Sequence, residues 1–259
     1  MSATPQFVSG TPAIPAVPET KIVRVYVWQM PIRIAHWLNV FSIAVLSFTG
    51  YYLYDPFIIS RGKGAFLLGR ILFIHLVAGF VFIAAFLVRI YWLFVGNKWA
   101  RWRQFLPIGG TQWHDFLKQL KYYLFLEREP AFRVGHNPLA GATYSVVFLL
   151  MLTEVLTGLA LLNHIVGSRI LGFFVDWIPA LVSIHYVREI HFLIMFAFCA
   201  FVIHHVYSAV LIGIEERSGL VGGMFSGYKF FAESRVKLDA QHKLGTSGHR
   251  NQPSKSRSA

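Results

Sequence analysis

Two histidines in the last long apolar stretch of the chain have a spacing that suits metal ligands on one helix. Residues 184–214 are mostly apolar, and His191 and His205 lie fourteen residues apart within them. An α-helix turns about 100° and rises about 1.5 Å per residue, so both imidazoles would lie within about 40° of one face and about 21 Å apart. One membrane helix would therefore offer an imidazole near each membrane surface.

The rest of the chain has the composition of a multi-span membrane protein. Of its 259 residues, 55% are hydrophobic and only 14% are charged, a charged fraction that is low for a soluble domain. Four apolar runs are long enough to cross the hydrocarbon core of a bilayer. We expect spans at about residues 34–54, 70–96, 139–163 and 184–214. The predicted fold class is all-α, a polytopic membrane four-helix bundle.

The segments between the spans predict interfacial helices. Residues 112–126 place apolar side chains at helical spacing opposite Lys118 and Lys121, a pattern typical of helices that lie along a membrane surface. Residues 164–183 are apolar but broken by glycine, proline and charged residues, which favours an interfacial helix over a fifth span. The expected domains are a flexible tail over 1–22, the membrane domain over 23–231 and a flexible polar tail over 232–259.

The distribution of Lys and Arg predicts the orientation. Of the 24 basic residues, 18 lie in three segments: residues 1–33, the connection 97–138 and the C-terminal segment. Five lie in the other connections, and Arg89 lies inside a span. The positive-inside rule therefore places both termini in the cytoplasm. Because the basic residues flank apolar runs, the net charge of +12 indicates contact with membrane lipid and not with nucleic acid.

This orientation sorts four histidines into two pairs by depth. His75 begins the second span and lies near the outer surface, as does His191, whereas His36 and His205 lie near the cytoplasm. A low-spin b-type haem is held by two imidazoles from different helices. The sequence thus predicts an outer haem between His75 and His191 and an inner haem between His36 and His205. The alternative for any single membrane histidine is a hydrogen bond between helices.

Small and charged residues along the spans predict the surroundings of these haems. Gly79 follows His75 by one turn and Gly50 lies at the depth of the outer haem, where each would leave room for a porphyrin or simply let helices pack closely. Arg89 lies at the depth of the inner haem, where a buried cation would pair with a haem propionate. Glu154 lies too far along the third span to pair with Arg89, which leaves a neutral, hydrogen-bonded role or a proton path.

The start of the third span predicts a quinone site. His136 and Asn137 precede Pro138 at the cytoplasmic edge of the membrane, and the imidazole, the amide and the free N–H groups of a helix start can all donate hydrogen bonds. The alternative is an ordinary helix start, with Asn at the N-cap and Pro in the first turn.

Several short pieces of the chain resemble the b-type cytochrome subunit of membrane-bound uptake NiFe hydrogenases. Within residues 25–231, the matching pieces are Arg33-Ile-Ala-His36-Trp37-Leu38, Thr49-Gly50, Ile74-His75, Gly135-His-Asn-Pro138, Leu156-Thr-Gly-Leu-Ala160, and Arg188, His191, Leu193, Phe201 and His205. The resemblance implies four transmembrane helices in the bacterial inner membrane and up to two haems b on the same four histidines. It also implies reduction of quinone with electrons from the iron–sulfur small subunit of a periplasmic hydrogenase, whose large subunit cleaves hydrogen.

Two departures leave the partner enzyme open. Phe192 stands where the family usually has a basic residue, and Phe196 where it usually has Trp. The cytochrome subunits of respiratory formate dehydrogenases carry a similar two-histidine helix, so such an oxidoreductase is the alternative partner. From a different class, a haem-free proton-coupled transporter or a membrane anchor would also suit four apolar spans. Under the leading interpretation the chain is an electron-transfer and quinone-reducing subunit with no hydrogen-cleaving site of its own.

Overall fold

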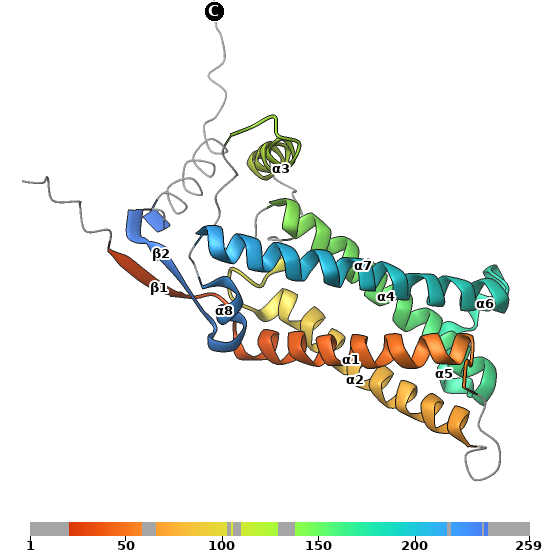
Figure 1. The fold of residues 1–259 in the computed structure, drawn as a ribbon. Coiled ribbons are helices and arrows are strands. Elements are labelled where there is room, and N and C mark those ends of the chain that lie inside the picture. The colour runs from red at the N-terminus through yellow and green to blue at the C-terminus, as the bar shows by residue number, and fades with distance from the viewer. Residues whose placement is uncertain are drawn as a thin grey trace, which may run out of the picture.

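Four long antiparallel helices dominate the computed structural model (Figure 1), which describes residues 21–58, 66–102, 105, 110–128, 138–216, 219–234 and 236–237. They are α1 (Met30–Tyr54), α2 (Leu67–Val95), α4 (Pro138–Val166) and α7 (Ile184–Glu216). Each is long and apolar enough to cross a membrane. Their bounds lie within four residues of the predicted ones, so the predicted four-span architecture is confirmed.

The two ends of the bundle differ in their connections. At one end, here called the loop end, α1 leads to α2, and α4 leads to α7 through two short helices, α5 (Arg169–Val175) and α6 (Trp177–Leu181). Seven and five residues are too short to cross a bilayer, so residues 164–183 are not a fifth span, as expected. The other end, here called the termini end, holds the first residues of α1 and α4 and the last residues of α2 and α7 (Figure 1).

The start of α1 is fixed by its neighbours. Pro31 lies in its first turn, where a missing backbone N–H is tolerated. Gln29, the residue just before α1, accepts two hydrogen bonds on Oε1. The donors are Trp92 Nε1 and the Asn97 backbone N–H, each at 2.9 Å. These bonds tie the first turn of α1 to the last turn of α2 and set the axial position of the residues that follow on α1.

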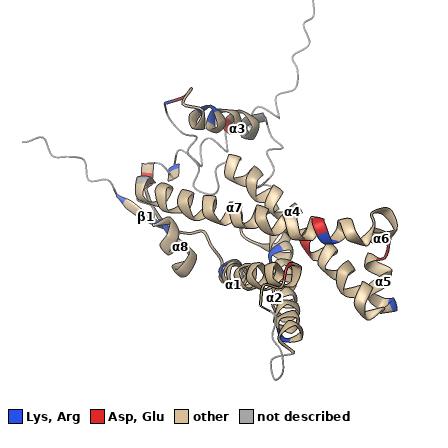
Figure 2. Ribbon diagram, turned by 45° about the vertical axis from the view of Figure 1, so that its right-hand side comes forward, with Lys and Arg blue, Asp and Glu red and all other residues tan. Residues whose placement is uncertain are grey.

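The core of the bundle lies between its two ends. Helix α1 packs chiefly on α2, and α4 packs on α7. A buried cluster joins α2, α4 and α7 near mid-height and consists of Phe82, Phe86, Met151, Ile194 and Phe198. Outward-facing side chains such as Phe48 and Phe73 are largely exposed, and charged residues are sparse along the four long helices (Figure 2). Such an exterior suits contact with lipid.

A two-stranded ribbon at the termini end joins segments from opposite ends of the chain. Strand β1 (Ile22–Tyr26) pairs antiparallel with β2 (Tyr228–Ala232), with Ile22 opposite Ala232 and Tyr26 opposite Tyr228. Helix α8 (Leu220–Ser226) precedes β2. A small second core beside the ribbon contains Val27, Trp28, Trp99 and Phe231. The sequence pattern did not predict this ribbon, because two five-residue strands so far apart in the chain leave no long periodic signal.

Outside the four-helix bundle lie helix α3 and the residues that follow β2. Helix α3 (Gly110–Tyr123) covers most of the predicted interfacial helix and packs beside α4. Beyond β2, the Lys237 ammonium lies 2.9 Å from a Glu233 carboxylate oxygen and holds the pKa of that carboxyl below its usual range. Residues 1–20 and 238–259, which make up most of the two predicted tails, lie outside the described residues.

Candidate functional site

At the loop end, the structure brings His75 and His191 together. His75 lies on α2 and His191 on α7, and the centroids of their rings are 6.4 Å apart with an interplanar angle of 69°. We call these two residues the loop-end pair. They were matched by depth in the sequence, and the two helices do present them to each other.

At the termini end, the same helix α7 meets α1 through a second pair. The ring centroids of His36 and His205 are 6.3 Å apart, with an interplanar angle of 52°; we call these residues the termini-end pair. The neighbouring His204 is exposed and lies 3.5 Å from Ser208 on its own helix. His205, and not His204, is therefore the histidine of this segment that faces His36.

The separation within each pair fits one metal ion between two imidazoles. A bond from an imidazole nitrogen to a transition metal is about 2 Å long, and the nitrogen lies about 1 Å from its ring centroid, so two rings on one metal have centroids about 6 Å apart. The described residues contain no cluster of three or more His, Cys, Asp or Glu side chains with metal-site geometry. Each pair could hold the iron of a haem, for which the porphyrin would supply the remaining ligands.

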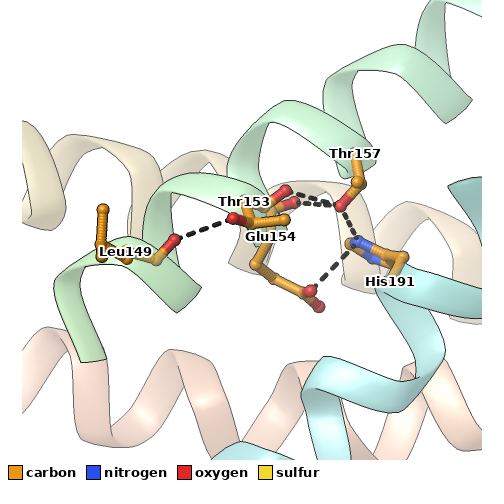
Figure 3. A network of polar contacts seen from close by, with 5 residues as sticks. All are labelled: Leu149, Thr153, Glu154, Thr157 and His191. Atoms are coloured by element: carbon orange, nitrogen blue, oxygen red, sulfur yellow. Dashed lines mark hydrogen bonds and ion pairs between the residues drawn. The ribbon is translucent and has the colours of Figure 1, made fainter. Parts of the chain in front are cut away.

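Polar side chains hold the outer edge of each imidazole in the loop-end pair. Thr49 Oγ1 on α1 lies 2.8 Å from His75 Nδ1, and Thr157 Oγ1 on α4 lies 3.0 Å from His191 Nδ1. Glu154 Oε2 lies 3.4 Å from the same nitrogen of His191 (Figure 3). Glu154 thus contacts a histidine of the loop-end pair and not Arg89. Sequence reasoning assigned no role to either threonine, although the repeated Thr-Gly dipeptides were the available signal.

Glycines beside these threonines leave space for the rings. A Cβ atom on Gly50 would lie 3.3 Å from His75 Cε1, and a Cβ atom on Gly158 would lie 3.1 Å from His191 Cε1. Gly50 was predicted at this depth, whereas Gly158 was not singled out. Gly79 differs, since its nearest neighbour would be Leu46 at 4.0 Å, an ordinary contact. It lies against a leucine of α1 and not against an imidazole.

The termini-end pair lies in aromatic surroundings. Phe201 stacks on His205 at 5.4 Å and 22°, and Tyr144 of α4 meets His205 edge-on at 6.1 Å. Trp37 meets His36 at 5.2 Å and 89°. His36 Nδ1 is buried and has no hydrogen-bond partner within the described part of the chain. The imidazoles of this pair are therefore positioned by ring packing more than by hydrogen bonds.

Arg89 lies in the half of α2 toward the termini end and is linked to the termini-end pair through aromatic rings. Its guanidinium carbon lies 5.0 Å from the Phe105 ring centroid and 5.3 Å from that of Phe148. Phe105 also contacts Tyr144, which contacts His205. Arg89 Nη1 is buried without a hydrogen-bond partner among the described residues. A buried guanidinium nitrogen of this kind can take an anionic partner. His136 and Asn137, the predicted quinone-site residues, lie outside the described residues.

Comparison with known proteins assigns the chain to a family. Residues 27–227 match the prokaryotic cytochrome b561 family. The chain is 38% identical to a probable Ni/Fe-hydrogenase B-type cytochrome subunit of Bradyrhizobium diazoefficiens (81% of this chain, 87% of the relative) and 36% identical to one of Rhodobacter capsulatus (82% and 84%). It is 35% identical to the probable Ni/Fe-hydrogenase 1 B-type cytochrome subunit of Escherichia coli K12 (80% and 92%). The extent of these matches, together with the paired histidines, shows that the chain belongs to the prokaryotic cytochrome b561 family.

Proposed function

We propose that this protein carries electrons across a bacterial inner membrane with two b haems, one held by His75 and His191 and the other by His36 and His205. The observation that carries this proposal is the presence of two imidazole pairs, with ring centroids 6.4 and 6.3 Å apart, at two levels of one helix bundle. Each haem, when bound, supplies an iron that accepts and releases one electron. The polypeptide supplies the axial nitrogens, the dry surroundings and the spacing.

The direction of transfer follows from the proposed orientation. The positive-inside rule places the termini end, with 18 of the 24 basic residues in its segments, in the cytoplasm. The loop-end pair then faces the periplasm. The relatives carry names that mark them as Ni/Fe-hydrogenase cytochrome subunits, which supports an iron–sulfur subunit of such a hydrogenase as electron donor. Hydrogen cleavage is assigned to the hydrogenase large subunit.

The termini end is the proposed site of electron delivery to quinone. Arg89, whose buried Nη1 has no hydrogen-bond partner among the described residues, is the proposed partner of a propionate of the termini-end haem. His136 and Asn137 immediately precede α4 at this end of the bundle, and they are the proposed hydrogen-bond donors to quinone. Gly50, which leaves space beside the His75 ring, is proposed to line the groove of the loop-end haem.

The decisive measurement is a reduced-minus-oxidised visible spectrum of the purified complex with its haem-to-protein ratio. We expect the bands of b-type haem and two haems per copy of this chain. A preparation with no reducible haem would overturn the electron-transfer proposal and favour a transporter or an anchor. Metal and cofactor analysis of copurifying subunits tests the partner: nickel supports a hydrogenase, whereas a pterin cofactor supports a formate dehydrogenase-like enzyme.

A further inference from the structure

We propose that Thr49 and Thr157 are positioning residues that fix the tautomer of His75 and His191, so that each imidazole presents an unprotonated Nε2 to iron. This inference rests on the proposed haem ligation and adds to it the means by which the loop-end pair is prepared for the metal. The two threonines lie on α1 and α4, whereas the histidines lie on α2 and α7. All four long helices therefore contribute to this one site.

A threonine hydroxyl has a single proton to donate. Thr49 Oγ1 lies 2.7 Å from the Val45 carbonyl oxygen, and Thr157 Oγ1 lies 2.7 Å from the Thr153 carbonyl oxygen. A carbonyl oxygen can only accept, so each hydroxyl uses its proton to donate within its own helix. Toward the histidine, the hydroxyl oxygen then offers only its lone pairs. The partner atom, Nδ1, must therefore be the nitrogen that carries a hydrogen.

Protonation of one imidazole nitrogen determines which nitrogen is free to bind a metal. A neutral imidazole carries one N–H, and when Nδ1 is protonated, Nε2 keeps its lone pair. That lone pair is what coordination to iron requires. A hydrogen bond donated by Nδ1 also raises the basicity of the ligand nitrogen on the other side of the ring. The threonine hydroxyls thus select the ligating form and strengthen it.

Glu154 adds to this arrangement at His191. Its Oε2 lies 3.4 Å from His191 Nδ1, on the side of the ring that Thr157 also contacts (Figure 3). If Glu154 is ionised, a carboxylate oxygen in this place would be attracted by an N–H and repelled by a bare nitrogen lone pair. In its ionised form Glu154 would therefore favour the same tautomer of His191 as Thr157 does. His75 has the threonine contact alone among the interactions of its Nδ1 with described residues.

The glycine that follows each threonine lets the imidazole ring approach the helix closely. Cβ atoms built on Gly50 and Gly158 would lie 3.3 and 3.1 Å from Cε1, the ring atom bonded to Nδ1. The Thr-Gly dipeptide thus holds Nδ1 with its first residue and leaves room for Cε1 with its second. Other threonines on α4 show that the carbonyl bond alone does not create this contact: Thr143 and Thr153 also donate to a carbonyl one turn back. Neither of them contacts an imidazole in the part of the chain that the structure describes.

The experiment uses Thr157→Val and Thr49→Val in the assembled complex, because valine keeps the shape and removes the hydroxyl. Thr153→Val is the matched control, since its hydroxyl bonds Leu149 one turn back on the same helix (Figure 3). Thr157→Ser tests rescue by a restored hydroxyl. The readouts are a redox titration and the electron paramagnetic resonance g values of the loop-end haem, identified as the haem lost in His75→Ala.

We expect each valine variant to raise the ratio of reduced to oxidised loop-end haem about tenfold at a fixed potential, a shift of about 59 mV for a one-electron couple. The termini-end haem, Thr153→Val and Thr157→Ser should match the wild type. Loss of the loop-end haem in Thr157→Val with retention in Thr153→Val and Thr157→Ser also supports the proposal. Unchanged g values and potentials in both valine variants overturn it while leaving haem ligation intact. If His75→Ala and His191→Ala retain both haems, the proposed function itself fails.

Discussion

The loop-end and termini-end pairs hold their imidazoles at nearly the same separation, 6.4 and 6.3 Å, yet their surroundings differ in polarity. Both Nδ1 atoms of the loop-end pair face threonine hydroxyls, and one also faces a carboxylate. In the termini-end pair, His36 Nδ1 is buried without a partner in the described chain, and His205 is packed by aromatic rings. The comparison separates two effects. Helix packing sets the distance between the imidazoles and so whether a metal ion fits, and the neighbouring side chains set the midpoint potential of that metal.

For the two proposed haems, this difference predicts an order of midpoint potentials. Hydrogen bonds from Nδ1 raise the basicity of the ligand nitrogen and stabilise the more oxidised iron. Glu154 would act in the same direction through its charge in its ionised form. We therefore expect the loop-end haem to have the lower potential. Electrons that enter at the loop end would then move toward the termini end without an uphill step.

The largest expected effect is the loss of one haem at one end only. His191→Ala should remove the loop-end haem and His205→Ala the termini-end haem, because each iron would lose one of its two axial ligands. The haem-to-protein ratio should fall from two to about one in each variant, with different residual redox potentials. His204→Ala serves as the control, since its ring contacts Ser208 on its own helix. Equal residual spectra in the two variants would contradict the assignment of the pairs to separate haems.

A smaller effect is expected from Arg89→Gln at the termini end. Removing the buried cation should weaken binding of the termini-end haem about tenfold, because a hydrogen bond to a charged group is worth about 1.5–3 kcal/mol. The loop-end haem should keep its occupancy, and Arg89→Lys should recover part of the loss. Haem titration of the haem-depleted complex, followed at the two redox potentials, provides the measurement. Weakening of both haems to the same degree would mean that Arg89 supports the bundle and not one site.

Gly158→Ala tests the loop end by crowding and not by removal of a ligand. A methyl group 3.1 Å from His191 Cε1 must push the ring aside, and overpacking of this kind costs about 1–3 kcal/mol. We expect about fivefold weaker binding of the loop-end haem, measured by haem titration. Gly79→Ala is the matched control, because among the described residues its new methyl group would meet Leu46 alone, at 4.0 Å. Equal losses in the two variants would show that general helix packing is responsible.

The smallest expected effect is that of Phe201→Leu at the termini end. This substitution removes the ring that stacks on His205 at 5.4 Å, and aromatic pairs of this kind contribute about 0.5–1.5 kcal/mol beyond their buried area. We expect a small shift in the potential of the termini-end haem and none at the loop end. Redox titration checks this, with Phe196→Leu as a control on the same helix. A shift in the potential of the loop-end haem alone would contradict the assignment of Phe201 to the termini-end site.

The sequence by itself determined the features that lie within single helices. Hydrophobic runs gave the four spans to within a few residues, because a bilayer requires about 20 apolar residues per crossing. Fixed helical rise and turn also placed His191 and His205 on one face of α7. Predicted depth in the membrane then matched His191 with His75 and His205 with His36. In the structure the rings of each pair face one another across two helices.

Tertiary structure alone decided the contacts between helices, because the rotation of one helix against another depends on all of its packing neighbours. Gly79 shares a face with His75 by periodicity, yet it meets Leu46. Thr49 and Thr157 reach imidazoles on other helices, while Thr153 one turn away on the same helix does not. The ribbon of β1 and β2 likewise depends on long-range pairing, for which short strands carry no local pattern.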